Sequence, residues 1–91
     1  MVAVNILMKQ GAESSNNPRD IRGIGISNGI VCNVYAVADL YRYLKDNSNL
    51  KIYLANSDIF LVPIMALNGD IYIRSSFAEG VADSLMKLPR I

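Results

Sequence analysis

The sequence predicts a small single-domain α+β sandwich in which two helices cover one face of a mostly antiparallel sheet. Three patterns lead to this prediction: short segments with the alternating polarity of strands, one apolar stripe with helical spacing, and a serine–glutamate pair typical of a helix start. The chain of 91 residues is expected to form one domain, because each of two domains would have too small a core. The expected element order is β-β-α-β-β-β-α.

The first quarter of the chain predicts two strands joined by a loop. Residues 2–8 are rich in β-branched and apolar residues on both faces, which favours a central strand. Residues 9–20 are polar and are expected to form a flexible loop. Residues 21–26 alternate and predict a second strand, in which Gly23 and Gly25 leave one face bare. Such a face is typical of a place where another backbone or a ligand lies close.

A helix is predicted next. Apolar residues recur every three or four positions at Ile30, Val34, Val37, Tyr41 and Leu44, and polar residues end the pattern at 46–49. Cys32 would then be a small buried residue near the helix start. The Asn28-Gly29 pair leaves an alternative open, since it also favours a hairpin turn in which Ile30–Val34 would be a strand.

Residues 50–75 predict a three-stranded antiparallel meander. Residues 51–54 and 70–74 alternate, residues 59–67 are apolar throughout, and Asn68-Gly69 favours a type I′ hairpin turn. Pro63 lacks an N–H group, so its strand is expected to be kinked or to lie at an edge. A short helix over Pro63–Leu67 is the alternative, and we favour the strand because five residues make little more than one helical turn.

A second helix is predicted near the end of the sequence. Ser76 and Glu79 have the spacing of a capping box. Ala78, Val81, Ala82 and Leu85 would follow on one face of this helix, and Pro89 would end it. Gly80 lowers its expected stability by about 1 kcal/mol relative to alanine.

The composition bears on partners and location. Hydrophobic residues make up 52% and charged residues 19% of the chain, against about 25% charged in an average soluble domain. This apolar excess predicts a homo-oligomer or an apolar partner interface. The net charge of +1 gives no global attraction for nucleic acid or an anionic membrane. The chain shows neither a spanning apolar run nor a signal-peptide pattern, so a cytoplasmic location without membrane association is expected.

The chain has no histidine and a single cysteine. Within one chain this excludes histidine-based catalysis, internal disulfides and zinc sites built from histidine and cysteine. No catalytic residue, metal or cofactor is predicted. The absence of a recognisable catalytic motif argues against an enzyme without deciding the question.

Two groups of residues are candidate binding sites. The first is a phosphate-binding loop before the predicted helix, where backbone N–H groups attract anions: Arg19, Arg22, Gly23, Gly25, Ser27, Asn28 and Gly29. Its glycine spacing differs from the dinucleotide fingerprint, and a tight joint between strand and helix is the structural alternative. The second group serves packing at an interface or stacking on bases: Tyr35, Tyr43, Tyr53, Tyr72 and Arg74, with Tyr53 and Tyr72 expected to share a sheet face.

The leading functional hypothesis is therefore a small, non-enzymatic binding or interaction module that acts as a homo-oligomer and binds a partner protein or a small ligand, which could be anionic. The alternative is a protein that binds nucleic acid or a nucleotide through the Arg19–Gly29 loop at a helix N-terminus.

Overall fold

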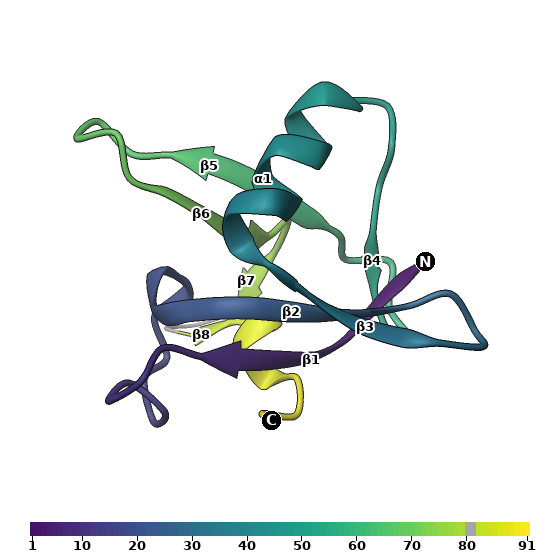
Figure 1. The fold of residues 1–91 in the computed structure, drawn as a ribbon, viewed down its shortest axis with the longest axis horizontal. Coiled ribbons are helices and arrows are strands. Elements are labelled where there is room, and N and C mark those ends of the chain that lie inside the picture. The colour runs from purple at the N-terminus through teal and green to yellow at the C-terminus, as the bar shows by residue number, and fades with distance from the viewer. Residues whose placement is uncertain (80–81) are drawn as a thin grey trace.

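The first strand, β1 (Val2–Met8), lies inside a four-stranded mixed sheet in a computed structural model that describes residues 1–79 and 82–91. It pairs antiparallel with β2 (Ile21–Ser27) on one side and parallel with β4 (Tyr53–Leu54) on the other, which confirms the predicted central position (Figure 1). The loop between β1 and β2 contains a short 3-10 turn at Pro18–Asp20.

The predicted helix start at Ile30 is wrong, because the chain forms a hairpin there. Strand β3 (Cys32–Ala36) pairs antiparallel with β2, so the strand alternative for this segment is the correct one. Gly29 has a φ of +96°, which glycine adopts without steric cost. The Asn28 side-chain oxygen accepts hydrogen bonds from the N–H groups of Ile30 and Val31, and this local turn outweighs the helical spacing of the apolar residues.

Helix α1 (Val37–Asp46) begins directly after β3. It buries Leu40 and Leu44 and packs against both the four-stranded sheet and a second sheet. Asn47 ends it by donating its backbone N–H and its side-chain amide to the Tyr43 carbonyl. The helical spacing in the sequence therefore predicted the second part of the segment correctly.

The second sheet is the antiparallel pair β5 (Leu61–Met65) and β6 (Ile71–Ser75), which confirms two of the three strands of the predicted meander. The three-stranded sheet is wrong, because β4 belongs to the four-stranded sheet and pairs parallel with β1. An antiparallel bridge between Tyr53 and Phe60 links β4 to this pair. Pro63 lies in β5 opposite Ile73, which confirms the strand rather than the short helix.

The turn between β5 and β6 differs from the predicted type I′. Gly69 has a φ of +92° while Asn68 stays at negative φ. The Gly69 N–H donates to the Ala66 carbonyl, and the Ala66 N–H donates to the Asp70 carbonyl. This pattern is that of a longer hairpin loop with glycine in the left-handed position.

The predicted second helix is wrong over the residues that the structure describes. Strands β7 (Ala78–Glu79) and β8 (Ala82–Asp83) form a short antiparallel pair, and the only helical part is a 3-10 turn at Ser84–Lys87. Gly80 and Val81, which the prediction also covered, lie outside the described residues. The Asp83 side chain caps the 3-10 turn by accepting the Leu85 N–H.

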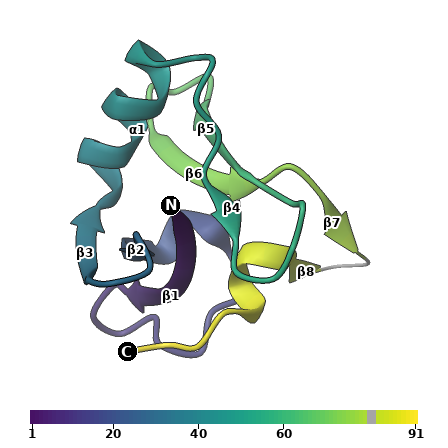
Figure 2. The same ribbon diagram turned by 90° about the vertical axis from the view of Figure 1, so that its right-hand side faces the viewer.

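The core lies between the four-stranded sheet on one side and α1, the second sheet and the C-terminal 3-10 turn on the other (Figure 2). Its most completely buried apolar side chains come from every part of the chain: Ile6, Ile24, Ile52, Ile73 and Leu85. After the 3-10 turn the chain runs beside β1, where the Ile6 N–H donates to the Pro89 carbonyl and the Ile91 N–H donates to the Ile6 carbonyl.

Candidate functional site: an open sheet edge and a tyrosine-lined pocket

Strand β3 forms an open edge of the four-stranded sheet, whose order is β3-β2-β1-β4 (Figure 2). All five of its residues are exposed, and none of them is charged or is proline. Proteins usually protect an edge strand with lysine, proline, a bulge or a covering element. Both strands of the second sheet are edge strands, and they follow this rule, since β5 carries Pro63 and β6 carries Arg74. The residues of β3 offer no such protection.

The backbone of β3 offers hydrogen-bonding groups at this edge. The Asn28 N–H donates to the Val31 carbonyl at 3.2 Å, so Asn28 and Val31 form a hydrogen-bonded pair of the β2–β3 ladder. Bonded and non-bonded pairs alternate along an antiparallel ladder. When this alternation is continued along the β2–β3 register, Asn33 and Tyr35 are the hydrogen-bonded residues of β3, and their N–H and C=O groups point toward β2. The N–H and C=O groups of the other three residues, Cys32, Val34 and Ala36, consequently point away from the sheet.

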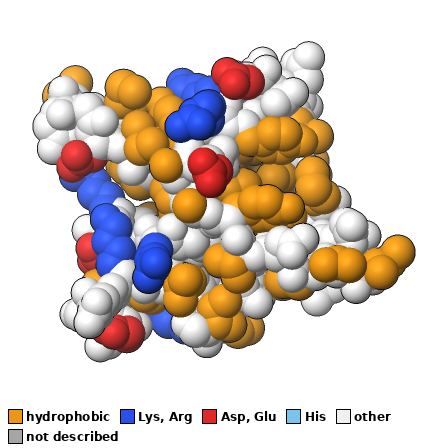
Figure 3. Space-filling view, in the orientation of Figure 1, with side chains coloured by type: hydrophobic (Ala, Val, Ile, Leu, Met, Phe, Trp, Pro, Cys, Tyr) orange, Lys and Arg blue, Asp and Glu red, His pale blue; other side chains and the backbone are white. Residues whose placement is uncertain are grey.

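Apolar side chains accompany this edge from the hairpin turn to the start of α1. Ile30 is 92% exposed at the turn, and Val34 and Tyr35 in β3 are 45% and 44% exposed. Hydrophobic side chains gather on this side of the molecule, beside α1 and along the projecting β2–β3 hairpin (Figure 3). The open backbone edge and the apolar surface therefore coincide.

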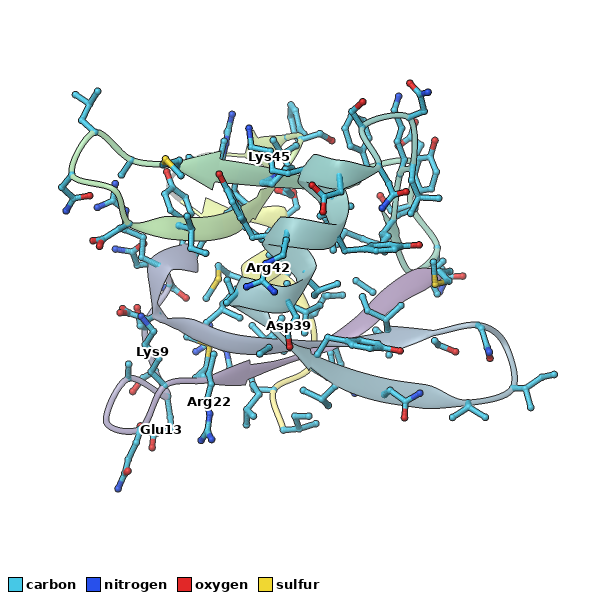
Figure 4. The ribbon with its side chains drawn as sticks, turned by 45° about the horizontal axis from the view of Figure 1, so that its top comes forward. Lys9, Glu13, Arg22, Asp39, Arg42 and Lys45 are labelled. Carbon is cyan, nitrogen blue, oxygen red and sulfur yellow. The ribbon has the colours of Figure 1, made fainter. Side chains whose placement is uncertain are left out.

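A pocket of about 380 Å³ lies beside β3, between α1 and the residues that precede β1 and β4. Its lining is mostly apolar: Met1, Tyr35, Asp39, Leu40, Tyr43 and Ile52. Asp39 has the only charged side chain among them, and Met1 brings the α-amino group of the chain. Asp39 lies four residues before Tyr43 on α1, so the two side chains share one helix face. Asp39 lies at the start of the helix, just above β3 (Figure 4).

The glycines of the predicted phosphate loop lie inside β2, and the premise of a helix N-terminus at this loop is wrong. Helix α1 begins at Val37, after the whole of β3. The bare face of β2 is filled by neighbouring side chains. A Cβ atom on Gly23 would lie 2.9 Å from Val34 Cγ1, and one on Gly25 would lie 1.8 Å from Asn5 Oδ1. The close approach predicted for these glycines is therefore made by the protein itself.

The polar residues of the same loop are used in the β2–β3 turn. The Ser27 hydroxyl accepts the Gly29 N–H at 3.1 Å, and Asn28 binds the two following N–H groups. The two arginines are separate from this turn. The Arg19 guanidinium lies 4.9 Å from the centre of the Tyr72 ring, and Arg22 is exposed on β2.

Arg19 also lines a second hollow of about 380 Å³ together with Lys9, Gly69, Asp70 and Ile71. Lys9 and Arg22 lie on the same side of the molecule (Figure 4). This side carries several cations, but Asp70 contributes a negative charge to the hollow itself.

The remaining predicted interface residues are spread over both sheets. Tyr53 and Tyr72 belong to different sheets, so the expectation that they share a sheet face is wrong. The Tyr53 ring packs edge-on against Phe60, with their centres 6.1 Å apart. Arg74 is exposed on β6 opposite Val62. Cys32 is exposed in β3 rather than buried at a helix start, because the segment that contains it is a strand.

Sequence reasoning identified Tyr35 and Tyr43 but missed the acidic residue between them. The spacing of Asp39 and Tyr43 was a visible signal, but the position of Tyr35 beside them depends on the strand that precedes α1.

Within residues 1–79 and 82–91, no group of three or more acidic or cysteine side chains is placed to hold a metal ion, and no helix is long and apolar enough to cross a membrane. Comparisons with protein-family models, curated proteins and solved structures found no match for this chain.

Proposed function

We propose that this protein is a non-enzymatic interaction module that associates with a second copy of itself through β3. The observation that carries the proposal is the exposed, uncharged edge strand with apolar side chains on both sides of it. Exposed strands of this kind pair readily with a strand from another chain. Pairing would also cover part of the apolar surface that the composition of the chain implies.

The orientation of the backbone groups selects a register. A two-fold axis at Val34 places Val34 opposite its copy and Cys32 opposite Ala36 of the second chain, so that all of β3 is paired. The outward N–H and C=O groups of Cys32, Val34 and Ala36 in each chain then form hydrogen bonds with those of the other chain. Registers shifted by one residue pair groups that face β2 and are excluded.

The chemistry of the strand favours a second copy as its partner. A two-fold axis brings each charged residue near it close to its own copy, and like charges that lie opposite each other destabilise a strand pair. Residues 32–36 carry no charge, so this cost is absent. A standard interface covers about 800 Å² of each partner. The exposed hairpin turn around Ile30 lies on the same side of the chain and would add apolar area to that of the strand.

Introducing a charge at the proposed axis is expected to prevent association. The native chain should sediment as a dimer at micromolar concentration, and Val34→Lys should sediment as a monomer because two ammonium groups would face each other. Leu67→Lys is the matched control, since Leu67 is fully exposed on the β5–β6 hairpin at the opposite end of the molecule. Unchanged far-ultraviolet circular dichroism would show that both variants are folded. A native monomer, or a dimer that survives Val34→Lys, would contradict the proposal.

Cross-linking tests the register of the same pairing. In Ala36→Cys, mild oxidation should produce a covalent dimer, because Cys32 and the new cysteine of the other chain would lie about 5.5 Å apart between Cα atoms, within disulfide range. A disulfide within one strand is impossible, since four residues of strand span about 13 Å. The native chain should not cross-link under the same conditions. Efficient cross-linking through Cys32 alone would place the axis at Cys32 and overturn the register.

A second candidate function is binding of a nucleic acid or nucleotide on the side of Lys9, Arg19 and Arg22. It is favoured by the two cations at one hollow and by the Tyr72 ring beneath Arg19, which combine charge with an aromatic surface. If this function operates, single-stranded nucleic acid should bind with an affinity that falls as salt rises.

The double variant Arg19→Ala/Arg22→Ala should then weaken binding by about tenfold or more and reduce the dependence of log affinity on log salt by about two. Fluorescence anisotropy with a labelled oligonucleotide measures both quantities. Lys45→Ala/Lys51→Ala is the control, because it removes the same charge at a different hollow. Binding that is absent, or equally weakened by the control, would remove this candidate.

A further inference from the structure

The pocket beside α1 combines two aromatic rings with one carboxylate. Tyr35 comes from β3 and Tyr43 from α1; both line the hollow, and they are 44% and 43% exposed. The face of an aromatic ring carries negative charge density and attracts cations within about 6 Å of its centre. Two such rings at one hollow give it a preference for positive charge.

Asp39 reinforces that preference. Its side chain is exposed and has no hydrogen-bond or ion-pair partner among the described residues. No lysine or arginine side chain lines the pocket, and the α-amino group of Met1, which does line it, forms no ion pair with Asp39. This carboxylate would repel an anionic ligand. A purely apolar ligand would displace water from the carboxylate without replacing the lost hydrogen bonds.

The floor and the volume of the pocket determine the size and the apolar part of the ligand. Leu40 and Ile52 are buried beneath the hollow and give it an apolar base. A volume of about 380 Å³ is at the small end of the range of ligand pockets. The fitting ligand is therefore compact and has apolar groups around its positive charge.

From this combination we infer that the pocket formed by Tyr35, Asp39, Tyr43 and the apolar floor binds a small organic cation of the alkylammonium class. The cation lies against the tyrosine rings with Asp39 as its counter-charge, and its alkyl groups contact Leu40 and Ile52. All of these residues belong to one chain. The inference therefore does not depend on the pairing of β3, and the Val34→Lys variant provides a background in which the two can be tested separately.

Choline is a suitable probe because a neutral molecule of the same shape exists, 3,3-dimethyl-1-butanol. In a nuclear magnetic resonance titration of the full chain, choline should shift the amide signals of Tyr35, Asp39 and Tyr43 in a saturable way. Its affinity should exceed that of 3,3-dimethyl-1-butanol by about tenfold, the difference that the positive charge makes. Equal affinities would show an unselective apolar pocket and overturn the inference, as would the absence of saturable binding.

Variants separate the charge from the rings. Asp39→Asn should weaken choline binding by about fivefold or more, whereas Asp46→Asn, on the same helix but outside the pocket, should leave it unchanged. Tyr43→Phe should retain binding because the ring face remains, and Tyr43→Leu should lose most of it. A titration repeated on Val34→Lys should give the same affinity. Equal loss in Asp39→Asn and Asp46→Asn would show only a general charge effect and contradict the site.

Discussion

Asp83→Ala is expected to lower the free energy of unfolding by about 3 kcal/mol. The Asp83 residue is only 8% exposed, and its carboxylate accepts hydrogen bonds from the Ser75 N–H at 3.1 Å and the Leu85 N–H at 2.9 Å. The Ser75 hydroxyl, which is fully buried, lies 2.5 Å from the same carboxylate. Removing the acceptor leaves the two N–H groups without this partner, whereas the Ser75 hydroxyl can still donate to the Phe77 carbonyl. Each buried donor without a partner costs about 1–3 kcal/mol.

Urea denaturation followed by circular dichroism measures this effect. Asp83→Asn should lose less stability than Asp83→Ala, because the amide retains one acceptor oxygen of similar position. Asp58→Ala is the control, since Asp58 is exposed on a turn and should change stability by less than about 0.5 kcal/mol. A loss in Asp83→Ala as small as that of the control would show that the carboxylate does not hold the two segments together.

Gly25→Ala is expected to cost about 2 kcal/mol or more, and removal of the Asn5 side chain is expected to restore most of it. The new Cβ atom would lie 1.8 Å from Asn5 Oδ1, a distance at which one of the two side chains must move. Gly25 has an ordinary strand conformation, since only three other glycines of the described chain have positive φ. The cost therefore comes from overlap with Asn5 and not from backbone strain.

A double-mutant cycle tests this explanation. It compares the native protein, the two single variants and the double variant by thermal and urea unfolding. Asn5 Oδ1 is buried without a hydrogen-bond partner, so Asn5→Ala alone should be nearly neutral. In the Asn5→Ala background, Gly25→Ala should cost less than about 0.5 kcal/mol, which corresponds to a coupling of about 2 kcal/mol between neighbouring residues. A cost that is the same in both backgrounds would place its origin in the backbone instead.

The strands were predictable where an alternating pattern or a short apolar run had a clear boundary. β2 and β6 follow from alternation and β1 and β5 from apolar runs, and Pro63 was compatible with its strand because the strand lies at an edge. The start of α1 was not predictable from periodicity. Val34 fits the helical stripe, yet the Asn28 turn upstream determines that it lies in a strand.

The second predicted helix failed for a different reason. Ser76 and Glu79 have the right local spacing, but Asp83 forms bonds with Ser75, a residue eight positions earlier. Such a contact between distant residues has no signature in a local pattern. The same holds for the candidate site, where Tyr35 and Tyr43 were recognised as aromatic residues near a surface. Their common pocket with Ile52 could not be predicted, because it depends on how three separate segments pack.

The position of residues 89–91 beside Ile6 has a consequence for the folding of the chain. β1 precedes the other strands that the structure describes, yet it pairs with residues 53–54 and with residues 89–91. Contacts between such distant segments form slowly, because a long loop must close before any of them is gained. During synthesis the backbone of β1 therefore lacks some of its native partners until residues 89–91 have left the ribosome. Complete formation of the central sheet consequently follows the pairing of residues far apart in the sequence.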